Sequence, residues 1–462
     1  MTTPSIGRAM DVSAAVAARV AQKFGAENVA THAAELAAYE VDGMRPAAAV
    51  RVGSAEEIAE LLRFAGAEKL AVIPCGGRTK LGIGAVPARY DIALDLSGMN
   101  RVLAYEPRDL TLGVEPGARI SDLWGVLGCE GQWLPVIDAF GDRSTIGGVL
   151  AADSASPLRH GFGGPRDFTL GMEFVTGYGA IAKSGGRVVK NVTGYDMHKV
   201  LIGSLGTLGV ITRANFKTFP WPPARDVFVA HFESCADAMD FCKAVQKSPL
   251  EPRLVEIISP EAERLISASA KTPQPLNAKG WSAVIGVTAH RRVVERHARE
   301  LKELATQNKA REFVRIGGDD QSEILNAACT VPSFILAADL GAVIFRIAAV
   351  PAAMSALAAR LAKVASDAEI QYATVLRPHG LVYFALLPNS KPPADVSRAA
   401  LEVFRSAEEM GAKARIEFAP VELKRTVSVW GTARQDFELM RRVKNIFDPG
   451  NVLSPGRFAG GI

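Results

Sequence analysis

The stretch 74–82 reads PCGGRTKLG and follows directly on the apolar run LAVI at 70–73. The run predicts a short buried strand, because it is apolar throughout and ends at proline and glycine. Upstream, a strand is expected at 47–52, and a helix is expected to follow the capping box at 54–57. The order strand, helix, strand predicts a βαβ unit that ends in a glycine-rich loop. In such a loop, successive main-chain N–H groups can form a concave site for phosphate oxygens.

Two further glycine clusters lie downstream. The sequence STIGG at 144–148 should open a short helix, whose N-terminus would add a positive dipole to the same kind of site. The third cluster contains KNVTGYD at 190–196 and GSLGTLGVIT at 203–212. Each loop taken alone is equally well explained as a simple turn, since short glycine patterns recur by chance.

Two common nucleotide-binding motifs are excluded. The glycines at 77 and 82 have P-loop spacing, but Ile83 occupies the position of the required lysine. The segment GYGAIA at 177–182 loosely matches the dinucleotide fingerprint, but a β-type run follows it, so it favours a hairpin. The sequence therefore indicates neither a Walker-type ATPase nor a Rossmann-type NAD enzyme.

The 462 residues include 53 Lys and Arg, 49 Asp and Glu and 48% hydrophobic residues, which is typical of a folded globular protein. A net charge of +4 gives no reason to expect nucleic-acid binding. The five cysteines form no CxxC pair, so the chain offers no local motif for an iron–sulfur cluster or a zinc site. The most apolar stretch, 334–357, is interrupted by charges and Pro351, and Met1–Ser5 lack a signal-peptide pattern. We therefore expect a cytoplasmic protein without a membrane span.

Taken together and in this order, the three clusters resemble the FAD-binding domain of the vanillyl-alcohol oxidase, or p-cresol methylhydroxylase-type (PCMH-type), superfamily. Within it, the resemblance is strongest to the FAD-binding subunits of glycolate oxidase. It implies an α+β fold, with a PCMH-type FAD-binding domain of two α/β subdomains and an α+β, ferredoxin-like cap. A pattern at 448–457 is also similar, although Ser454 stands where the family has asparagine. The matching segments are GG-x-T-x-LG at 76–82, TIGG at 145–148, KNV-x-GYD at 190–196 and GS-x-G-x-LGV at 203–210.

The second half of the chain has a different texture, in which apolar strands alternate with amphipathic helices from Asp226 onward. The stiff connector TFPWPP at 218–223 marks the boundary between the halves. A helix is also expected over 11–24, with Asp11 as its N-cap. Strands are expected at 227–232, 255–258, 283–287, 343–349, 371–376, 381–387 and 415–418. The predicted parts are an N-terminal helical segment (1–40), the FAD-binding domain (41–220), the cap or substrate domain (221–425), and a C-terminal helix and tail that return to the FAD-binding domain (426–462).

The resemblance implies that the first two loops hold the FAD pyrophosphate and that the third offers main-chain hydrogen bonds to the cofactor. Relatives that attach flavin covalently use a His or Cys. The first loop has no His, and Cys75 precedes the glycines, so we expect non-covalent FAD. The candidate cofactor-binding residues are Cys75, Gly76, Gly77, Arg78, Thr79, Lys80, Leu81, Thr145, Gly147, Gly148, Ser156, Arg159, Lys190, Asn191, Gly209, Val210 and Ile211.

The catalytic candidates are Arg346, Arg377 and His379. Arg346 lies in the middle of an expected apolar strand, where a charge is costly unless it is paired, so it either meets an internal carboxylate or faces the flavin cleft. Hydroxy-acid dehydrogenases of the superfamily carry a longer metal-binding histidine motif near Arg377, of which only His379-Gly380 is present. We therefore expect no metal, and an ordinary polar role for His379 stays an alternative. His160 and His198 lie within the flavin motifs and are further candidates to approach the ring.

The resemblance implies the FAD-binding subunit of a glycolate oxidase-like complex, which oxidises a 2-hydroxy acid by hydride transfer to FAD. The partners would be a second flavin subunit and an iron–sulfur subunit, since this chain has no cysteine motif for a cluster. Attachment to the inner membrane, where it occurs, would be peripheral and through those partners. Two alternatives stay open: a self-sufficient FAD-dependent D-2-hydroxy-acid dehydrogenase, and a flavin-binding structural subunit without turnover. The missing metal motif favours the second alternative over the first.

Overall fold

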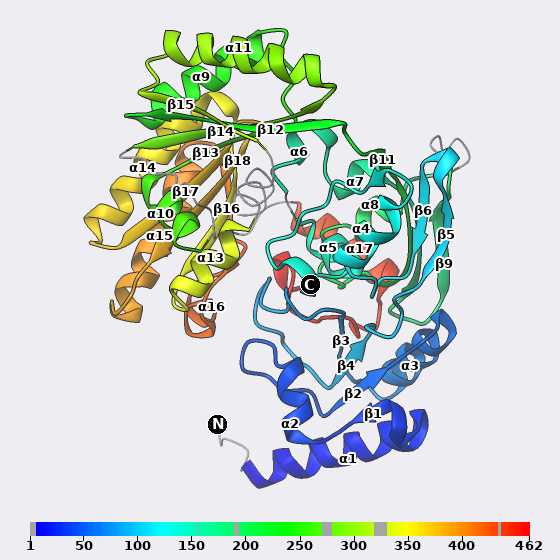
Figure 1. Ribbon diagram of the computed structural model, residues 1–462. Helices are drawn as coiled ribbons and strands as arrows, with labels where there is room; N and C mark the ends of the chain where they lie inside the picture. The colour runs from blue at the N-terminus through cyan, green and yellow to red at the C-terminus, as the bar shows by residue number, and fades with distance from the viewer. Residues whose placement is uncertain (1–5, 155, 189–193, 270–279, 318–329, 433–435) are drawn as a thin grey trace.

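The computed structural model describes residues 6–154, 156–188, 194–269, 280–317, 330–432 and 436–462. In these residues, three large sheets and one two-stranded ribbon organise the chain. Figure 1 shows a four-stranded sheet beside the N-terminal helix, a five-stranded sheet next to it, and an eight-stranded sheet on the far side of the molecule. We call the part built on the first two sheets the N-terminal domain, and the part built on the eight-stranded sheet the cap.

The four-stranded sheet contains the expected βαβ unit. Its strands follow the order β1-β2-β4-β3, with β2, β4 and β3 parallel and β1 antiparallel. Ser54 caps the connecting helix by accepting a hydrogen bond from the Glu57 main-chain N–H at 3.2 Å, as the sequence predicts. The elements are α1 (Ile6–Phe24), η1 (Ala26–Asn28), β1 (Val29–Ala30), α2 (Ala33–Leu36), η2 (Ala37–Tyr39), β2 (Ala48–Arg51), α3 (Ala55–Ala67), β3 (Val72–Cys75) and β4 (Ile92–Asp95).

The predicted start of the first helix is wrong. α1 begins at Ile6, so Asp11 lies inside the helix and is not its N-cap. Alanine and methionine at positions 9 and 10 favour the helix, and an interior aspartate costs less than about 1 kcal/mol, so the helix continues towards the N-terminus.

The five-stranded sheet is antiparallel throughout, in the order β5-β6-β10-β8-β9. The predicted hairpin at 177–182 is confirmed, because β8 and β9 pair on either side of it. The strands are β5 (Val102–Glu106), β6 (Thr111–Val114), β8 (Thr169–Thr176), β9 (Ile181–Gly185) and β10 (Gly209–Lys217), and β7 (Gln132–Trp133) pairs with β11 (Phe219–Pro220). The helices are η3 (Pro107–Asp109), α4 (Ile120–Gly128), η4 (Gly141–Arg143), α5 (Ile146–Ala152), α6 (Arg159–Phe162), α7 (Pro165–Phe168) and α8 (His198–Leu201).

The cap sheet has the order β15-β12-β14-β13-β17-β18-β16-β19 and is antiparallel. All seven strands expected in the cap form, and the sequence analysis missed the edge strand β15, which carries charges among its few apolar residues. The strands are β12 (Ala224–Phe232), β13 (Leu254–Ile258), β14 (Trp281–Ala289), β15 (Glu312–Ile316), β16 (Val343–Ala348), β17 (Gln371–Arg377), β18 (Leu381–Leu387) and β19 (Lys413–Phe418). The helices are α9 (Cys235–Lys247), α10 (Pro260–Ser269), α11 (Arg291–Gln307), α13 (Val331–Ala338), η5 (Pro351–Ala353), α14 (Met354–Asp367), α15 (Pro393–Glu409) and α16 (Val421–Thr426).

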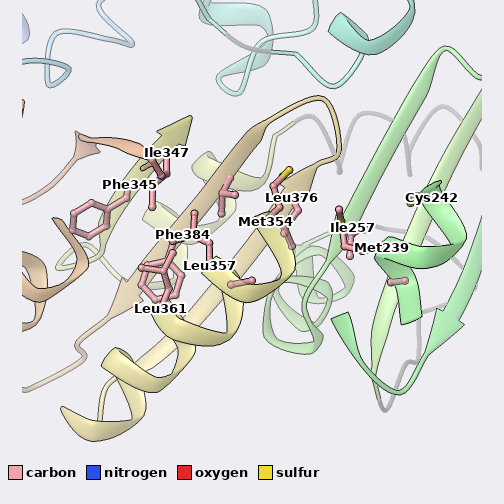
Figure 2. Packing of buried hydrophobic residues seen from close by; sticks show 14 of the residues in the cluster. Met239, Cys242, Ile257, Phe345, Ile347, Met354, Leu357, Leu361, Leu376 and Phe384 are labelled. Atoms are coloured by element: carbon pink, nitrogen blue, oxygen red, sulfur yellow. The ribbon is translucent and has the colours of Figure 1, made fainter. Parts of the chain in front are cut away.

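The alternation of side chains along the cap strands gives the sheet two faces, each of which carries its own buried apolar cluster. Phe345, Ile347 and Phe384 pack with residues of α9, α11, α14 and α15 in one core cluster, and Figure 2 shows this packing against α14. Because neighbouring residues of a strand point to opposite faces, Arg346 and Tyr383 lie on the other face of the sheet. That second face meets the N-terminal domain, since Tyr383 shares a cluster with Ile83 and Ala152.

The C-terminal tail returns to the N-terminal domain after α17 (Phe437–Phe447) and ends with η6 (Ala459–Gly461). It pairs with β3, because the Val72 N–H donates to the Val452 carbonyl at 2.8 Å and the Ser454 N–H donates to the Val72 carbonyl at 2.9 Å. Buried Asp448 holds this turn by accepting from Lys444 Nζ at 2.6 Å and from the main-chain N–H of Leu453 at 2.8 Å. Among the helices in the described residues, none combines the length and the apolar character that a bilayer crossing needs.

Replacing Asp448 should release the tail. Asp448→Ala leaves the buried ammonium of Lys444 without its counter-charge, so we expect a loss of about 3–5 kcal/mol in the free energy of unfolding. Glu438→Ala is the matched control, because it removes an exposed carboxylate on α17 that lies 3.3 Å from Arg442 and should cost less than about 1 kcal/mol. Urea unfolding of both variants measures the difference. Equal losses would contradict this account of the tail.

Candidate functional site

A crevice in the N-terminal domain runs between the three glycine clusters. It consists of two adjoining cavities, which share Pro74, Cys75, Gly76, Thr145, Gly148, Ala151 and Leu205 in their walls. Gly77–Leu81 line one cavity, and Gly147 and Gly209–Ile211 line the other. Of the candidate cofactor residues that the structure describes, all but Ser156 and Arg159 thus line the crevice.

The first two loops approach each other so closely that glycine is required. A Cβ atom on Gly77 would lie 1.9 Å from the carbonyl oxygen of Arg143, and one on Gly76 would lie 2.5 Å from Thr145 Oγ1. On the second loop, a Cβ atom on Gly147 would lie 2.8 Å from the Cβ atom of Pro116. Gly76 and Gly77 are therefore needed because the two loops lie in direct contact, and the crevice forms where the loops meet.

The first loop leaves its main-chain donors unused. Within the described part of the chain, none of the N–H groups of Gly77–Leu81 donates to a protein acceptor. Arg78 has a φ of 57°, so the loop turns through the left-handed region at this residue. Successive unused N–H groups beside a crevice are what a phosphate group needs, and the observed loop therefore fits the pyrophosphate of a dinucleotide cofactor.

The two cations of the first loop each have a carboxylate partner in the protein. Lys80 Nζ contacts Asp138 Oδ1 at 2.8 Å and Ser144 Oγ at 3.1 Å, which braces the first loop against the second. Burial lowers the pKa of Lys80, and burial alone would raise the pKa of Asp138, but the ion pair holds that pKa below its usual value. Arg78 lies over the Tyr39 ring, with its Nη1 3.6 Å from Asp95.

The remaining cofactor candidates have other positions. The Ser156 hydroxyl accepts a hydrogen bond from the Leu158 N–H at 3.2 Å, and Arg159 Nη1 lies 3.6 Å from Asp153 Oδ2. Lys190 and Asn191 lie outside the described residues. Of the two histidines in the flavin motifs, His198 is buried with its Nδ1 3.1 Å from Ser184 Oγ, and burial lowers its pKa.

Arg346 joins the cap to the end of α5. Its Nη1 donates to the main-chain carbonyl of Asp153 at 3.0 Å, and its Nη2 lies 3.4 Å from Asp153 Oδ2. Asp153 is the residue directly after α5, so this helix reaches from the glycine loop at its start to Arg346 at its end. The sequence left two settings open for Arg346, a contact with an internal carboxylate or a position facing the flavin cleft. The side chain contacts the carboxylate of Asp153, and a position facing the flavin stays a prediction.

Arg377 forms a buried ion pair within the cap. Its Nε lies 2.6 Å from Glu256 Oε1, and the two side chains are 2% and 0% exposed. The guanidinium also lies 5.0 Å from the centre of the Tyr383 ring. Glu256 therefore gives Arg377 a structural partner, and the pair holds Tyr383 in place beside Arg346, its neighbour across the strands.

His379 lies at the turn after β17, with its ring centre 6.3 Å from that of His160. Partial burial is the largest cause that lowers the pKa of His379, to about 4, and Arg377 is the next, because a second positive charge nearby is unfavourable. Burial followed by the charge of Arg253 also lowers the pKa of His160. Both residues are accessible from outside the chain, and their lowered pKa values keep the two imidazoles neutral at neutral pH.

Three guanidinium groups share two carboxylates at this interface, which we call the interface cluster. Asp153 lies within 3.6 Å of both Arg159 and Arg346, and Glu417 lies 3.4 Å from Arg415 and 4.0 Å from Arg346. These five side chains carry a net positive charge next to the two neutral histidines. Such a cluster can bind the carboxylate of a small acid.

Sequence reasoning missed Asp153, Arg415 and Glu417. They became visible only when strand pairing placed Arg415 opposite Arg346 and the end of α5 beside both. In the described residues, no group of three or more His, Cys, Asp or Glu side chains is arranged to hold a metal ion.

The fold and the crevice define a class of protein: a nucleotide-cofactor protein whose cap brings arginine side chains to the end of a helix that starts in the crevice. Comparison with family models identifies the cofactor of this class of protein. A model described as "FAD binding domain" matches residues 46–185, and one described as "FAD linked oxidases, C-terminal domain" matches 221–379 and 423–458. The chain belongs to the FAD-linked oxidases and is an FAD-dependent oxidoreductase. The predicted cofactor is confirmed, while its non-covalent binding stays a prediction.

Curated relatives extend over most of the chain. The glycolate oxidase subunit GlcD of Bacillus subtilis is 25% identical over 420 residues, which cover 89% of this chain and 88% of that protein. The D-2-hydroxyglutarate dehydrogenase of Xanthomonas citri is 26% identical over 454 residues, covering 94% and 95%. The glycolate oxidase subunit GlcE of Escherichia coli is 36% identical, but over only 132 residues, which cover 28% of this chain and 38% of that protein.

A solved structure of p-cresol methylhydroxylase with substrate bound shares the fold. It is 17% identical, covers 98% of this chain and 97% of its own, and superposes with a TM-score of 0.78. The predicted α+β fold of the PCMH-type superfamily is thereby confirmed. The second sheet of the FAD-binding part is antiparallel, however, so only the first of its two parts has the expected βαβ order.

An acidic side chain in the crevice should remove FAD without unfolding the protein. A Cβ atom on Gly148 would lie 3.5 Å from Thr145 Oγ1, an ordinary contact, so Gly148→Asp should fold and place a carboxylate against the pyrophosphate. We expect this variant to purify without the visible flavin band and to retain its secondary structure by circular dichroism. Gly77→Asp is less informative, because any side chain there meets the carbonyl of Arg143.

Gly125→Asp is the matched control for the acidic substitution. It adds the same charge to the same domain, in α4, at an exposed position with open space around its Cβ and outside the crevice walls. This variant should bind FAD like the wild type. If Gly148→Asp also binds FAD like the wild type, the assignment of the loops is wrong.

Proposed function

We propose that the protein is the FAD-binding subunit of a glycolate oxidase-like complex and oxidises a 2-hydroxy acid. The interface cluster carries this proposal, because its net positive charge lies at the end of α5, whose first turn forms part of the FAD crevice. One helix thus connects a cofactor site to a site for a small anion. The names of the relatives, which act on glycolate and D-2-hydroxyglutarate, agree with an anionic hydroxy-acid substrate.

Oxidation of a 2-hydroxy acid to a 2-oxo acid removes a hydride from carbon and a proton from the hydroxyl group. FAD, when bound, accepts the hydride. Arg346 binds the substrate carboxylate, since its guanidinium is held by Asp153 and is only 12% exposed. His379 accepts the hydroxyl proton on a ring nitrogen, because its low pKa keeps the imidazole neutral. Arg377 contributes by position: its charge lowers the pKa of His379, and its pair with Glu256 fixes the strand end.

The electrons then leave for an iron–sulfur subunit, with a second flavin subunit in the same complex. The cysteine distribution supports an external cluster, since Cys75, Cys129, Cys235 and Cys242 are free thiols and no two cysteines have a cluster-binding spacing. The similarity to GlcD and to GlcE supports a subunit role in such a complex. We place the complex in the cytoplasm, with any membrane contact made by the partners.

A second candidate is a self-sufficient D-2-hydroxy-acid dehydrogenase. It is favoured by the similarity to D-2-hydroxyglutarate dehydrogenase, which extends over 94% of this chain, whereas the similarity to GlcE covers 28%. The two candidates differ in the electron acceptor, because a self-sufficient enzyme reduces an artificial dye without any partner.

Anaerobic titration of the FAD-loaded chain tests the proposed oxidation. Glycolate, D-lactate and D-2-hydroxyglutarate are added in turn, and at least one should bleach the visible flavin band, while its methyl ester at the 1-carboxylate should not. Arg346→Lys should slow the bleaching by about 10–100-fold, since a forked contact is replaced by a single ammonium. Arg360→Lys, at an exposed ion pair on α14, is the matched control and should bleach like the wild type.

The outcomes separate the three functions. Bleaching with dye reduction only after partner subunits are added supports the complex, and dye reduction by the chain alone supports the self-sufficient dehydrogenase. If no hydroxy acid bleaches the loaded chain, with or without its partners, the chain is a flavin-binding structural subunit and the proposal fails.

The pH dependence of flavin reduction tests the role of His379. Only the neutral imidazole accepts a proton, so the rate falls as pH drops through the pKa of the folded protein. Because that pKa is lowered from 6.5 to about 4, the rate should be nearly constant from pH 7.5 to about pH 5 and fall below it. Stopped-flow reduction measures this profile.

His379→Gln should lower the rate about 100-fold and abolish the fall at low pH. His32→Gln, an exposed histidine of the N-terminal domain, serves as the control and should leave the profile unchanged. A wild-type profile with its midpoint near 6.5, or a His379→Gln variant with the wild-type rate, would show that His379 is not the base.

A further inference from the structure

Two buried cations from the C-terminal part of the chain hold the first glycine loop. Arg457, in the tail, donates through Nη2 to the carbonyl oxygens of Leu81 and Ile83. Lys424, in α16, donates through Nζ to the carbonyl oxygen of Gly82. Three successive loop carbonyls are therefore fixed by side chains more than 340 positions away in sequence.

The positive charge behind the loop is only partly balanced. Lys424 pairs with Asp42 at 2.7 Å. In the described part of the chain, Arg457 has no carboxylate within ion-pair distance, its side chain is buried, and its Nε has no hydrogen-bond partner. The charge of Asp42 also acts on Arg457, so two buried cations share one carboxylate. A buried guanidinium that shares its counter-charge is costly, so an anion that the protein does not itself supply is expected nearby.

Arg457 is also a wall of the FAD crevice. It lines the same cavity as Gly77–Leu81, whose N–H groups have no protein acceptor. Lys80 and Arg78 also line that cavity, but each has a carboxylate partner in the protein, Asp138 at 2.8 Å and Asp95 at 3.6 Å. Among the described residues, Arg457 therefore has no carboxylate within ion-pair distance and lies beside main-chain N–H groups that have no protein acceptor. The crevice that they line binds FAD, whose pyrophosphate carries two negative charges.

We propose that Arg457 is the charge partner of the FAD pyrophosphate and that Lys424 positions the loop for the same group. The cofactor site then has a fourth component, the C-terminal tail, in addition to the three glycine clusters. The inference concerns FAD binding alone and does not depend on the identity of the hydroxy acid. The pyrophosphate is favoured over the flavin ring because it is negatively charged in every redox state, as a permanent partner for a buried guanidinium must be.

Ligand fragments and charge variants of the FAD-free full chain test the proposal by calorimetry. ADP contains the pyrophosphate without the flavin ring, and adenosine contains neither phosphate. Arg457→Gln keeps a donor for the loop carbonyls but removes the charge, so it should weaken ADP and FAD binding by the same factor of about 10–100 and leave adenosine binding unchanged. Arg457→Lys keeps the charge and should retain most of the affinity for ADP.

Arg441→Gln is the matched control. Arg441 belongs to the same C-terminal part, is exposed, and donates from Nη2 to the Gly460 carbonyl at 3.2 Å without lining the crevice. This variant should bind all three ligands like the wild type.

Three results would overturn the proposal. Weaker FAD binding by Arg457→Gln with unchanged ADP binding would place the charge at the flavin ring. An equal loss for adenosine would show a structural role only. If Arg457→Gln does not fold, the wild type decides: its affinity for ADP should fall with rising salt while that for adenosine does not, and salt-independent ADP binding contradicts an unpaired cation at the pyrophosphate.

Discussion

The approach of one main chain to another at Gly77 is the constraint on which the site depends. A side chain at this position would overlap the Arg143 carbonyl, so only glycine lets the first loop lie against the segment that precedes α5. The contact places Thr145, the N-cap of α5, in the same crevice as the unused N–H groups of the first loop. Lys80 strengthens the contact between the loops through its bonds to Asp138 and Ser144. This structural role explains why the charge of Lys80 is paired within the protein.

α5 transmits this constraint to the cap. The helix has seven residues and spans about 10 Å at 1.5 Å per residue. Gly147 and Gly148 line the crevice in its first turn, and Asp153, directly after its last turn, accepts the hydrogen bond from Arg346. One short rigid helix therefore sets the distance between the cofactor loops and the arginines of the cap. A fixed distance of this kind helps to align a hydride donor with its acceptor.

The sequence predicts the parts of the site that depend on neighbouring residues. The glycine loops, the Ser54 cap and the strand that carries Arg346 all follow from local composition and spacing, and each forms in the structure. The contacts between domains could not be predicted in this way. Arg346 meets Asp153 across 193 positions, and Arg457 meets Leu81 across 376, and neither pair leaves a periodic pattern in the sequence.

The side chains of the cofactor candidates show the same division. The spacing of the first loop identifies its residues as walls of a phosphate site, but it cannot tell which cations serve as counter-charges. In the structure, Arg78 and Lys80 contact carboxylates of the N-terminal domain. Arg457 has no carboxylate within ion-pair distance among the described residues, and it lies in the C-terminal tail, which the sequence pattern shows only as the segment after a helix. The strand pairing between the tail and β3 supplies this information, and it exists only after folding.

The contact between the cap and the N-terminal domain combines apolar packing, such as Phe418 against Phe140, with a cluster of charged groups. A purely apolar interface would be more stable, since burying ionised groups costs several kcal/mol for each ion unless they are fully paired. Among the described residues, the interface cluster has more guanidinium groups than carboxylates, and Arg457 has no carboxylate within ion-pair distance, so both sites keep part of this cost when nothing is bound. On the two proposals above, anions that complete these sites would relieve this cost, and binding of cofactor and substrate would then stabilise the contact between the domains.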